Sequence, residues 1–237
     1  MKNVFCFVFV LACAFGVFSM SAQASFYFDF DTGYTAGDMT GQNGWTGGTV
    51  ATPPTPSPDG GNAMQGWNIQ HGLEESYSSG VVYASHHSWW SGDTTDGNND
   101  PPNNWLSLSD AASGKRSHVG GRWSAGQPGL LGGDGQTLTS FSDEGWYFSE
   151  ATIDVDNKTV TLDVTGPTGS TETVGPHTFA TAWGGGAPDS VDTVNLFTGD
   201  GAYIDGVHIG REKVPEASTV ALLGLGGLLA YVRSRRR

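Results

Sequence analysis

The sequence predicts an all-β fold, an antiparallel two-sheet β-sandwich or jelly roll, between two apolar terminal segments. Short runs of alternating apolar and polar residues recur along the chain, and Gly, Pro, Asn and Asp separate them. Between the terminal segments, no window holds a sustained apolar pattern of helical period. About ten such runs fit into residues 25–213, which suits one domain of two packed sheets.

The N-terminus has the pattern of a Sec signal peptide. Met1-Lys2 is followed by the apolar run 4–18, and Ala22 and Ala24 occupy the small-residue positions before Ser25. This arrangement predicts cleavage after Ala24, so that residues 1–24 form the signal peptide. Cys13 would be a lipidation site only within a lipobox, and Leu11 fits that pattern poorly.

The mature chain has no cysteine and is strongly acidic. Cys6 and Cys13 both lie in the signal peptide, so the exported domain has no disulfide and no thiol ligand. Residues 25–213 keep six of the 11 Lys and Arg residues and 23 of the 24 Asp and Glu residues, a net charge of −17. Such a surface repels nucleic acid, excludes a nucleic-acid-binding function, and favours an exported protein that could collect divalent cations.

The first half of the domain alternates strands with long turns. Residues 26–30 place three phenylalanines on one face and predict a half-buried strand. Residues 32–49 are a Gly-rich loop, and residues 53–60 are a Pro-rich surface loop. Residues 81–87 predict a further strand, and 93–104 a polar loop with two prolines.

A hairpin is the clearest element of the second half. Residues 145–155 and 159–164 predict its two strands, joined by a turn at 156–158. Ile153 and Val155 face the core in this prediction, with Val160, Leu162 and Val164 opposite. The remaining predicted strands are 116–123, 136–141, 171–180, 191–197 and 202–209.

The C-terminal tail predicts a short membrane anchor. Residues 220–232 carry no charge, and a helix over 217–232 would be about 24 Å long, somewhat less than the ~30 Å hydrocarbon core. The stop-transfer charges follow directly: Arg233, Arg235, Arg236 and Arg237. They would stay on the cytoplasmic side and leave the domain outside. A buried core helix is the alternative, but three glycines would weaken it.

The tail resembles the PEP-CTERM sorting signal of Gram-negative bacteria that make exopolysaccharide. The motif, an apolar helix and an arginine terminus occur in the required order over 214–237. The motif residues are Val214, Pro215, Glu216, Ala217, Ser218 and Thr219. Ala217 stands where the family usually has a second proline. The resemblance implies recognition by an exosortase, a membrane cysteine transpeptidase that cuts near this motif and releases or transfers the protein to the cell surface.

A looser resemblance concerns the mature domain. Residues 26–30, 41–45, the Trp146-Tyr147 hairpin and the closing 202–209 look like those of concanavalin A-like, laminin G-like exported domains. That resemblance implies a β-sandwich in which the first and last strands lie side by side.

Two candidate ligand sites adjoin each other. Asp93, Asp96, Asn98 and Asp100 offer oxygen ligands for calcium in a flexible loop, although such sequences also form simple turns. Trp89 and Trp90, with Trp105 beyond this loop, could form an aromatic platform for a glycan. Since adjacent strand residues point to opposite faces, at least one of the paired tryptophans should belong to the core.

An enzyme is the least favoured class. Glycosidases of this fold use two carboxylates, and Glu150, Asp154 and Asp156 are the nearest approach to such a pair. His86 and His87 would point to opposite faces of a strand and could not ligate one metal ion.

The sequence therefore favours a non-enzymatic structural or adhesive protein of the cell surface or extracellular matrix. Sec would export it, the inner membrane would hold it transiently with its domain in the periplasm, and exosortase would process it. The alternative is a lectin-like module that binds extracellular polysaccharide with or without calcium, and a glycoside hydrolase is third.

Overall fold

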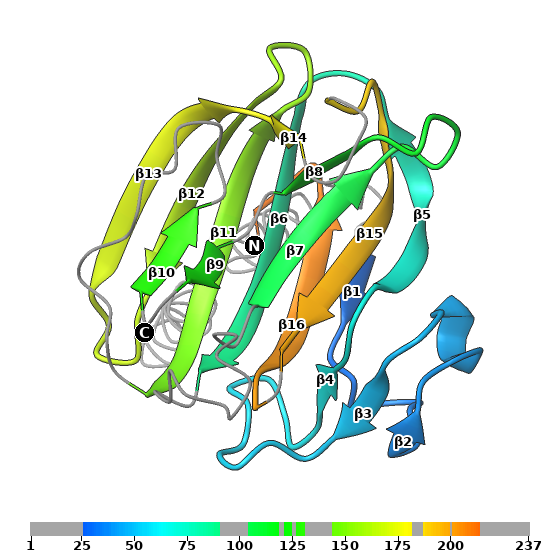
Figure 1. Ribbon diagram of the computed structural model, residues 1–237, viewed down its shortest axis with the longest axis vertical. Coiled ribbons are helices and arrows are strands. Elements are labelled where there is room, and N and C mark those ends of the chain that lie inside the picture. The colour runs from blue at the N-terminus through cyan, green and yellow to red at the C-terminus, as the bar shows by residue number, and fades with distance from the viewer. Residues whose placement is uncertain are drawn as a thin grey trace, which may run out of the picture.

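The computed structural model describes residues 26–90, 104–118, 121–124, 127–130, 144–181, 187–199 and 201–213. Within these residues the chain forms two antiparallel sheets that lie face to face, with a third sheet of two strands beside them (Figure 1). The described residues contain no α-helix. Nor do they contain a helix of the length and apolarity that a membrane crossing requires. The predicted β-sandwich is confirmed.

The larger sheet has nine strands, in the order β13-β12-β11-β6-β16-β4-β3-β2, with β1 also paired to β16. The strands are β1 (Phe26–Phe28), β2 (Gly37–Asp38), β3 (Thr49–Ala51), β4 (Ala63–Gln65), β6 (Val81–Trp90), β11 (Gly145–Asp154), β12 (Thr159–Thr165), β13 (Thr171–Thr178) and β16 (Tyr203–Gly210). Both β4 and β1 pair with β16, β4 at Ile204 and β1 from Val207 to Ile209.

The smaller sheet has five strands in the order β14-β8-β7-β15-β5. They are β5 (Ile69–Tyr77), β7 (Asn104–Ser109), β8 (Arg116–His118), β14 (Ala180–Thr181) and β15 (Val191–Thr198). The third sheet pairs β9 (Gly121–Ser124) with β10 (Gln127–Leu130). The single strand predicted over 116–123 is therefore wrong, because β8 and β9 belong to different sheets. Consecutive glycines at 120 and 121 weaken strand continuity at this point.

The first and last strands of the domain pair antiparallel, as the concanavalin A-like resemblance implied. Phe26 lies opposite Ile209, and Phe28 lies opposite Val207. Residues about 180 positions apart in the sequence are thereby held in one sheet, so both ends of the domain are fixed by the same ladder.

The predicted hairpin is β11 and β12. Their register pairs Ile153 with Val160 and Ala151 with Leu162, and the buried residues alternate along both strands. Ile153, Val155, Val160 and Leu162 are all buried, which confirms the predicted core face. Since the side-chain period of a strand is two, the even-numbered residues of β11 lie on the outer face of the sheet.

The core is built from the inner faces of both sheets. Ile153, Leu162 and Ile204 of the nine-stranded sheet join Leu108 and Leu196 of the five-stranded sheet in one buried cluster. Each of these side chains is almost completely removed from water. The sandwich is therefore closed by apolar contact between its layers, as its class requires.

The Gly-rich segment after β1 is more ordered than a simple loop. It contains β2 and a 3₁₀ turn, η1 (Gln42–Gly44), and it buries Trp45 in the core. The indole Nε1–H of Trp45 donates to the hydroxyl of Tyr34 at 2.9 Å. The Gln42 side chain donates to two main-chain carbonyls and thereby closes the segment on itself.

Several predictions fall on residues outside the described part of the chain. They are the signal peptide 1–24, the tail 214–237, the acidic loop from Asp93 to Asp100, and the strand 136–141.

Candidate functional site

Four aromatic side chains share the outer face of the nine-stranded sheet. The register of β11 with β6 places Trp146 opposite Trp89 and Phe148 opposite His87. Residues directly opposite in an antiparallel pair project to the same face. Their rings are in contact, with centroids 5.7 Å apart for Trp89 and Trp146 and 5.0 Å apart for His87 and Phe148.

These rings form the floor of an open groove of about 480 Å³, which we call the aromatic groove. Thr55 and Pro58 of the Pro-rich loop line it, as do Thr165, Gly166 and Pro167 of the β12–β13 turn. A Cβ at Gly145 would lie 2.7 Å from Pro167, so only glycine lets that turn approach β11 this closely. The volume is within the range of small-ligand sites.

The Pro-rich loop is fixed to the sheet by the groove's own residues. The Trp146 Nε1–H donates to the Thr55 carbonyl at 3.0 Å. Further along the same loop, the Asp59 carboxylate accepts a hydrogen bond from His87 Nδ1 at 2.5 Å. Trp89 is 4% exposed, and its indole N–H has no hydrogen-bond partner among the described residues. A buried N–H donor without a hydrogen-bond partner lowers the stability of the folded state.

A buried carboxyl group lies beside this loop. Asp205 pairs with His87 in the β16–β6 register, is fully buried, and has no well-formed hydrogen bond within the described residues. Burial is the main cause that raises the pKa of Asp205 to about 7. The Ser57 hydroxyl and the Gly206 amide act to lower this pKa, and the negative charges of Asp59 and Asp31 act to raise it. The group therefore titrates near neutral pH.

The same acidic side chains affect the phenol of Tyr27. Burial raises its pKa to about 12, and the charges of Asp59, Asp205, Asp29 and Asp31 add to the shift. Tyr27 is nevertheless half-exposed. Within the described residues, no group of three or more His, Cys, Asp or Glu side chains could hold a metal ion.

The residues singled out from the sequence are only partly brought together. Trp89 lies in the groove, whereas the side chains of Trp90 and Trp105 lie outside the described part, as does the acidic loop. His86 and His87 do point to opposite faces. His86 is buried, and burial together with the charge of His87 lowers its pKa to about 3.

The three carboxylates considered for a glycosidase are each engaged in the structure. Glu150 forms an ion pair with Lys213. Asp154 accepts two hydrogen bonds from Asn157, and these lower its pKa. Asp156 lies in the turn after β11 and accepts from the Gly80 amide at 2.9 Å.

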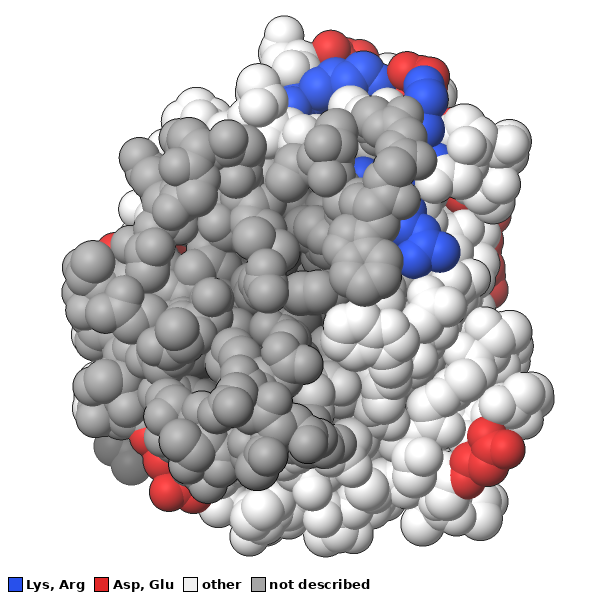
Figure 2. All heavy atoms as spheres, viewed as in Figure 1, with Lys and Arg blue, Asp and Glu red and all other residues white. Residues whose placement is uncertain are grey.

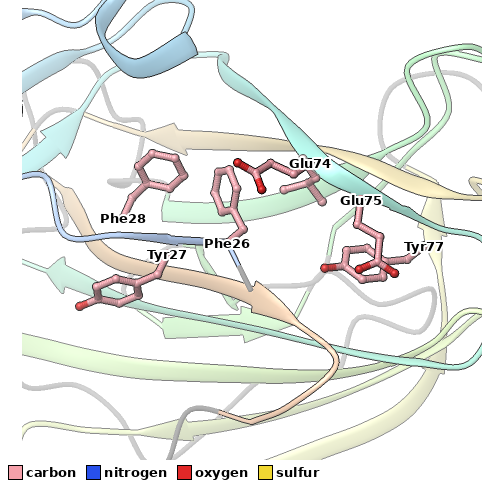
Figure 3. Close-up of a pocket in the computed structure, with 7 residues that line it drawn as sticks. Phe26, Tyr27, Phe28, Glu74, Glu75 and Tyr77 are labelled. Carbon is pink, nitrogen blue, oxygen red and sulfur yellow. The ribbon is translucent and has the colours of Figure 1, made fainter. Parts of the chain in front are cut away.

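A second, smaller pocket opens between β1 and β5. Its volume is about 160 Å³, and Phe26, Phe28, Glu74 and Tyr77 line it. Figure 3 shows Tyr27 pointing to the other side of β1 from the two phenylalanines. The pocket is smaller than most ligand sites. Figure 2 shows Lys and Arg side chains gathered near one end of the face in view, next to acidic residues.

Comparison with known families decides the role of the tail. Residues 213–237 match the family model of the PEP-CTERM protein-sorting motif. The chain carries a PEP-CTERM sorting signal. It is therefore an exosortase-targeted exported protein, with exosortase as its processing partner. The family model begins at Lys213, the last described residue of the domain.

Comparison of whole chains gives lower similarity. No curated protein matches the sequence. A solved sialidase is similar over 79% of this chain and 18% of its own, with 12% identity and a TM-score of 0.49. Lectin II from Ulex europaeus is similar over 79% of this chain and 97% of its own, with 11% identity and a TM-score of 0.45. Peanut lectin with a nine-residue peptide is similar over 82% and 100%, with 12% identity and a TM-score of 0.43.

Sequence reasoning missed most of the groove. Trp146 entered only as a part of the hairpin, and Phe148, His87 and Asp59 were not grouped with it. The alternation of aromatic residues at 146 and 148 carries the signal, because such a pattern places both on one face. The contact of β11 with β6 and of both with the 53–60 loop is not encoded in any local pattern.

Proposed function

We propose that this protein is a non-enzymatic structural or adhesive component of the cell surface or extracellular matrix, delivered there by exosortase. The observation that carries the proposal is the PEP-CTERM motif at 213–237, attached directly to a compact β-sandwich. The net charge of −17 supports a domain that stays soluble outside the membrane.

The experiment compares the full-length chain in a host with its exosortase and in the same host without it. Surface or extracellular protein should accumulate only when the enzyme is present. Changing Pro215→Ala together with Glu216→Ala should leave the precursor in the inner membrane, whereas Ser218→Ala, which retains both residues, should not. Surface delivery of the double variant at the normal rate would contradict the sorting step.

Glycan binding is the second candidate, and the aromatic groove favours it. Sugar rings present apolar faces and polar edges, and the groove offers indole and phenyl rings beside the polar Thr55 and Glu144. Phe148 is the cleanest residue to change, since Trp146 also holds the Pro-rich loop. Supplying or withholding calcium in the same assay tests the calcium-assisted alternative.

On a glycan array, Phe148→Ala should weaken any polysaccharide signal at least several-fold. Trp67→Ala serves as the matched control, because Trp67 is an exposed aromatic residue that does not line the groove. Equal binding by both variants would remove the groove from consideration. Absence of any glycan signal for the unmodified protein would leave adhesion through protein contacts as the role.

Glycoside hydrolysis remains the third hypothesis. It would require two carboxylates free to act on either side of a glycosidic bond. Glu150 is instead ion-paired with Lys213, and Asp154 is hydrogen-bonded to Asn157. These contacts support a non-enzymatic role. The non-enzymatic role would be overturned if the protein released reducing sugar from polysaccharide and both Glu150→Gln and Asp154→Asn lost this activity.

A further inference from the structure

The aromatic groove carries a carboxylate at each of its two ends. Glu144 lines the groove immediately before β11, next to the Trp146 end of the floor. Two residues further along β11, Phe148 lies opposite His87, whose ring binds the Asp59 carboxylate. Glu144 is exposed, and among the described residues no hydrogen bond or ion pair engages its carboxylate. One of the two carboxylates is therefore free to meet a ligand.

No positive charge balances these carboxylates within the groove. Among the described residues that line it there is no lysine or arginine. Five of the six basic side chains of the domain are described, and each already has a partner elsewhere: Lys115 and Lys158 on Asp189, Arg116 on Asn68, Arg211 on the Ser79 and Val81 carbonyls, and Lys213 on Glu150. The sixth, Arg122, lies on β9 in the third sheet. The groove is therefore an acidic site on an acidic domain.

Aromatic rings and carboxylates together favour a ligand with an ammonium group. The face of an aromatic ring attracts a cation, most strongly when the ring is an indole. A neutral sugar would stack on the same rings but would leave the Glu144 carboxylate unused. A uronic acid would meet this carboxylate and the net charge of −17 of the domain with a charge of the same sign.

We propose that the aromatic groove binds an amine-bearing polysaccharide, a polymer of hexosamine whose amino groups are free, in preference to neutral or acidic polysaccharides. The inference rests on the glycan-binding candidate under Proposed function and names the class of glycan for it. Side chains on one face of a strand recur about every 7 Å, so Trp146 and Phe148 can contact different sugar residues. The amino groups of these sugars would then lie near Glu144 at one end of the groove and near Asp59 at the other.

A polysaccharide suits this floor better than a basic protein segment does. The floor is wide, because its four rings come from two neighbouring strands, β6 and β11. A hexosamine offers such a floor the broad apolar face of its ring and offers the carboxylates an ammonium group. A lysine side chain offers the ammonium group on a narrow stem.

The test compares hexamers that differ only in their charged groups. The full-length protein in neutral detergent is titrated by calorimetry with a glucosamine hexamer, with its fully N-acetylated form and with a galacturonic acid hexamer. A slightly acidic buffer keeps the amines protonated. We expect the glucosamine hexamer to bind at least several-fold more tightly than the N-acetylated form, and the galacturonic acid hexamer not to bind. Sodium chloride should weaken only the glucosamine complex, because salt screens exposed charges.

Two carboxylate variants separate the groove from the overall charge of the protein. Glu144→Gln should weaken binding of the glucosamine hexamer about 1.5- to 5-fold, as expected for an exposed ion pair, and leave the affinity for the N-acetylated hexamer unchanged. Glu74→Gln is the matched control, because Glu74 is an exposed glutamate of β5 that lines the second pocket and not the groove. Phe148→Ala should weaken both hexamers, since both would stack on its ring.

Three results would overturn the inference. The first is an N-acetylated hexamer that binds as tightly as the glucosamine hexamer. The second is an equal loss of glucosamine binding in Glu144→Gln and Glu74→Gln, because an acidic protein attracts any polycation. The third is binding of pentalysine, lost in Phe148→Ala, without binding of the glucosamine hexamer, which would assign the groove to basic protein segments. If neither pentalysine nor any of the hexamers binds, the glycan-binding candidate itself is contradicted.

Discussion

Asp205 on β16 lies directly opposite His87 on β6, so a fully buried carboxyl group stands beside the imidazole that holds Asp59. The cost of burying its charge raises the pKa of Asp205 to about 7. Near neutral pH the domain therefore carries an ionisable group whose charged form is disfavoured by its surroundings.

The first prediction follows from the sign of that shift. With a folded pKa of about 7 and an ordinary value of 3.8, Asp205 favours the folded state at low pH, and this contribution is lost as the pH rises towards 7. Asp205→Asn should therefore gain stability relative to the unmodified protein by up to about 4 kcal/mol at pH 8, and less at pH 5. Denaturant unfolding of both proteins at each pH measures the difference.

The stability must be compared with that of the variant, because His86 changes the stability with pH in the opposite direction to Asp205. Its lowered pKa makes the folded state less stable as the pH falls below about 6.5. The total stability can therefore look flat between pH 4 and 6.5 while the two contributions change. A stability difference between Asp205→Asn and the unmodified protein that does not vary with pH would refute the Asp205 account.

The second prediction concerns Gly206, which has a φ of +57° in the bulge of β16. A Cβ there would lie 2.0 Å from Asp59 Oδ2 and 3.0 Å from His87 Nδ1. Gly206→Ala should displace Asp59, break its contact with His87, and cost about 1–3 kcal/mol. Gly72→Ala, at a position with open space around its Cβ, is the control. Equal unfolding midpoints for the two variants would contradict the close approach.

The third prediction tests the core hairpin. Ile153→Ala removes a fully buried side chain of the core cluster and should cost about 2–5 kcal/mol. Thr152→Ala, its neighbour on the outer face, should cost less than about 1 kcal/mol. Urea unfolding followed by tryptophan fluorescence would measure both. Similar losses for the two would mean that the faces of β11 are assigned the wrong way round.

Sequence alone predicted the fold where alternation is long and local. The β11–β12 hairpin has an uninterrupted period-two pattern, and its predicted boundaries agree with the structure within one residue. The closing strand β16 also agrees within one residue, although a bulge between Asp205 and His208 interrupts its alternation. Strand β5 escaped prediction because residues 72–76 break the alternation, and a bulge there shifts its register against β15. Strands β2 to β4 pair mainly with one another, and only β4 reaches a distant partner, with Met64 opposite Ile204. At two or three residues each, they are too short to show an alternating pattern.

The candidate sites were harder to predict for the same reason. The adjacent tryptophans 89 and 90 were expected on one strand, and Trp89 lines the aromatic groove. Its neighbours Trp146 and Thr55 come from distant segments that only the sheet order brings together. The ion pair of Glu150 with Lys213 joins residues 63 positions apart, and nothing near either one signals it.

The fourth prediction addresses calcium at the acidic loop of Asp93, Asp96, Asn98 and Asp100. A site with a Kd of roughly 10⁻⁴–10⁻³ M, in about 10 mM calcium, would stabilise the folded state by about 1.4–2.7 kcal/mol. The melting temperature should rise by several degrees in calcium but not in sodium chloride of equal ionic strength. Asp96→Asn with Asp100→Asn should abolish the difference. Equal melting temperatures in the two salts would identify the loop as a solvated turn.

Exosortase processing at the PEP-CTERM tail underlies the proposed role of this protein. Intact-mass analysis of the surface or extracellular form tests it most directly, because cleavage near Pro215 must remove the terminal arginines. We expect a mature protein that lacks Arg233, Arg235, Arg236 and Arg237. A surface form whose mass still includes these four arginines would contradict it.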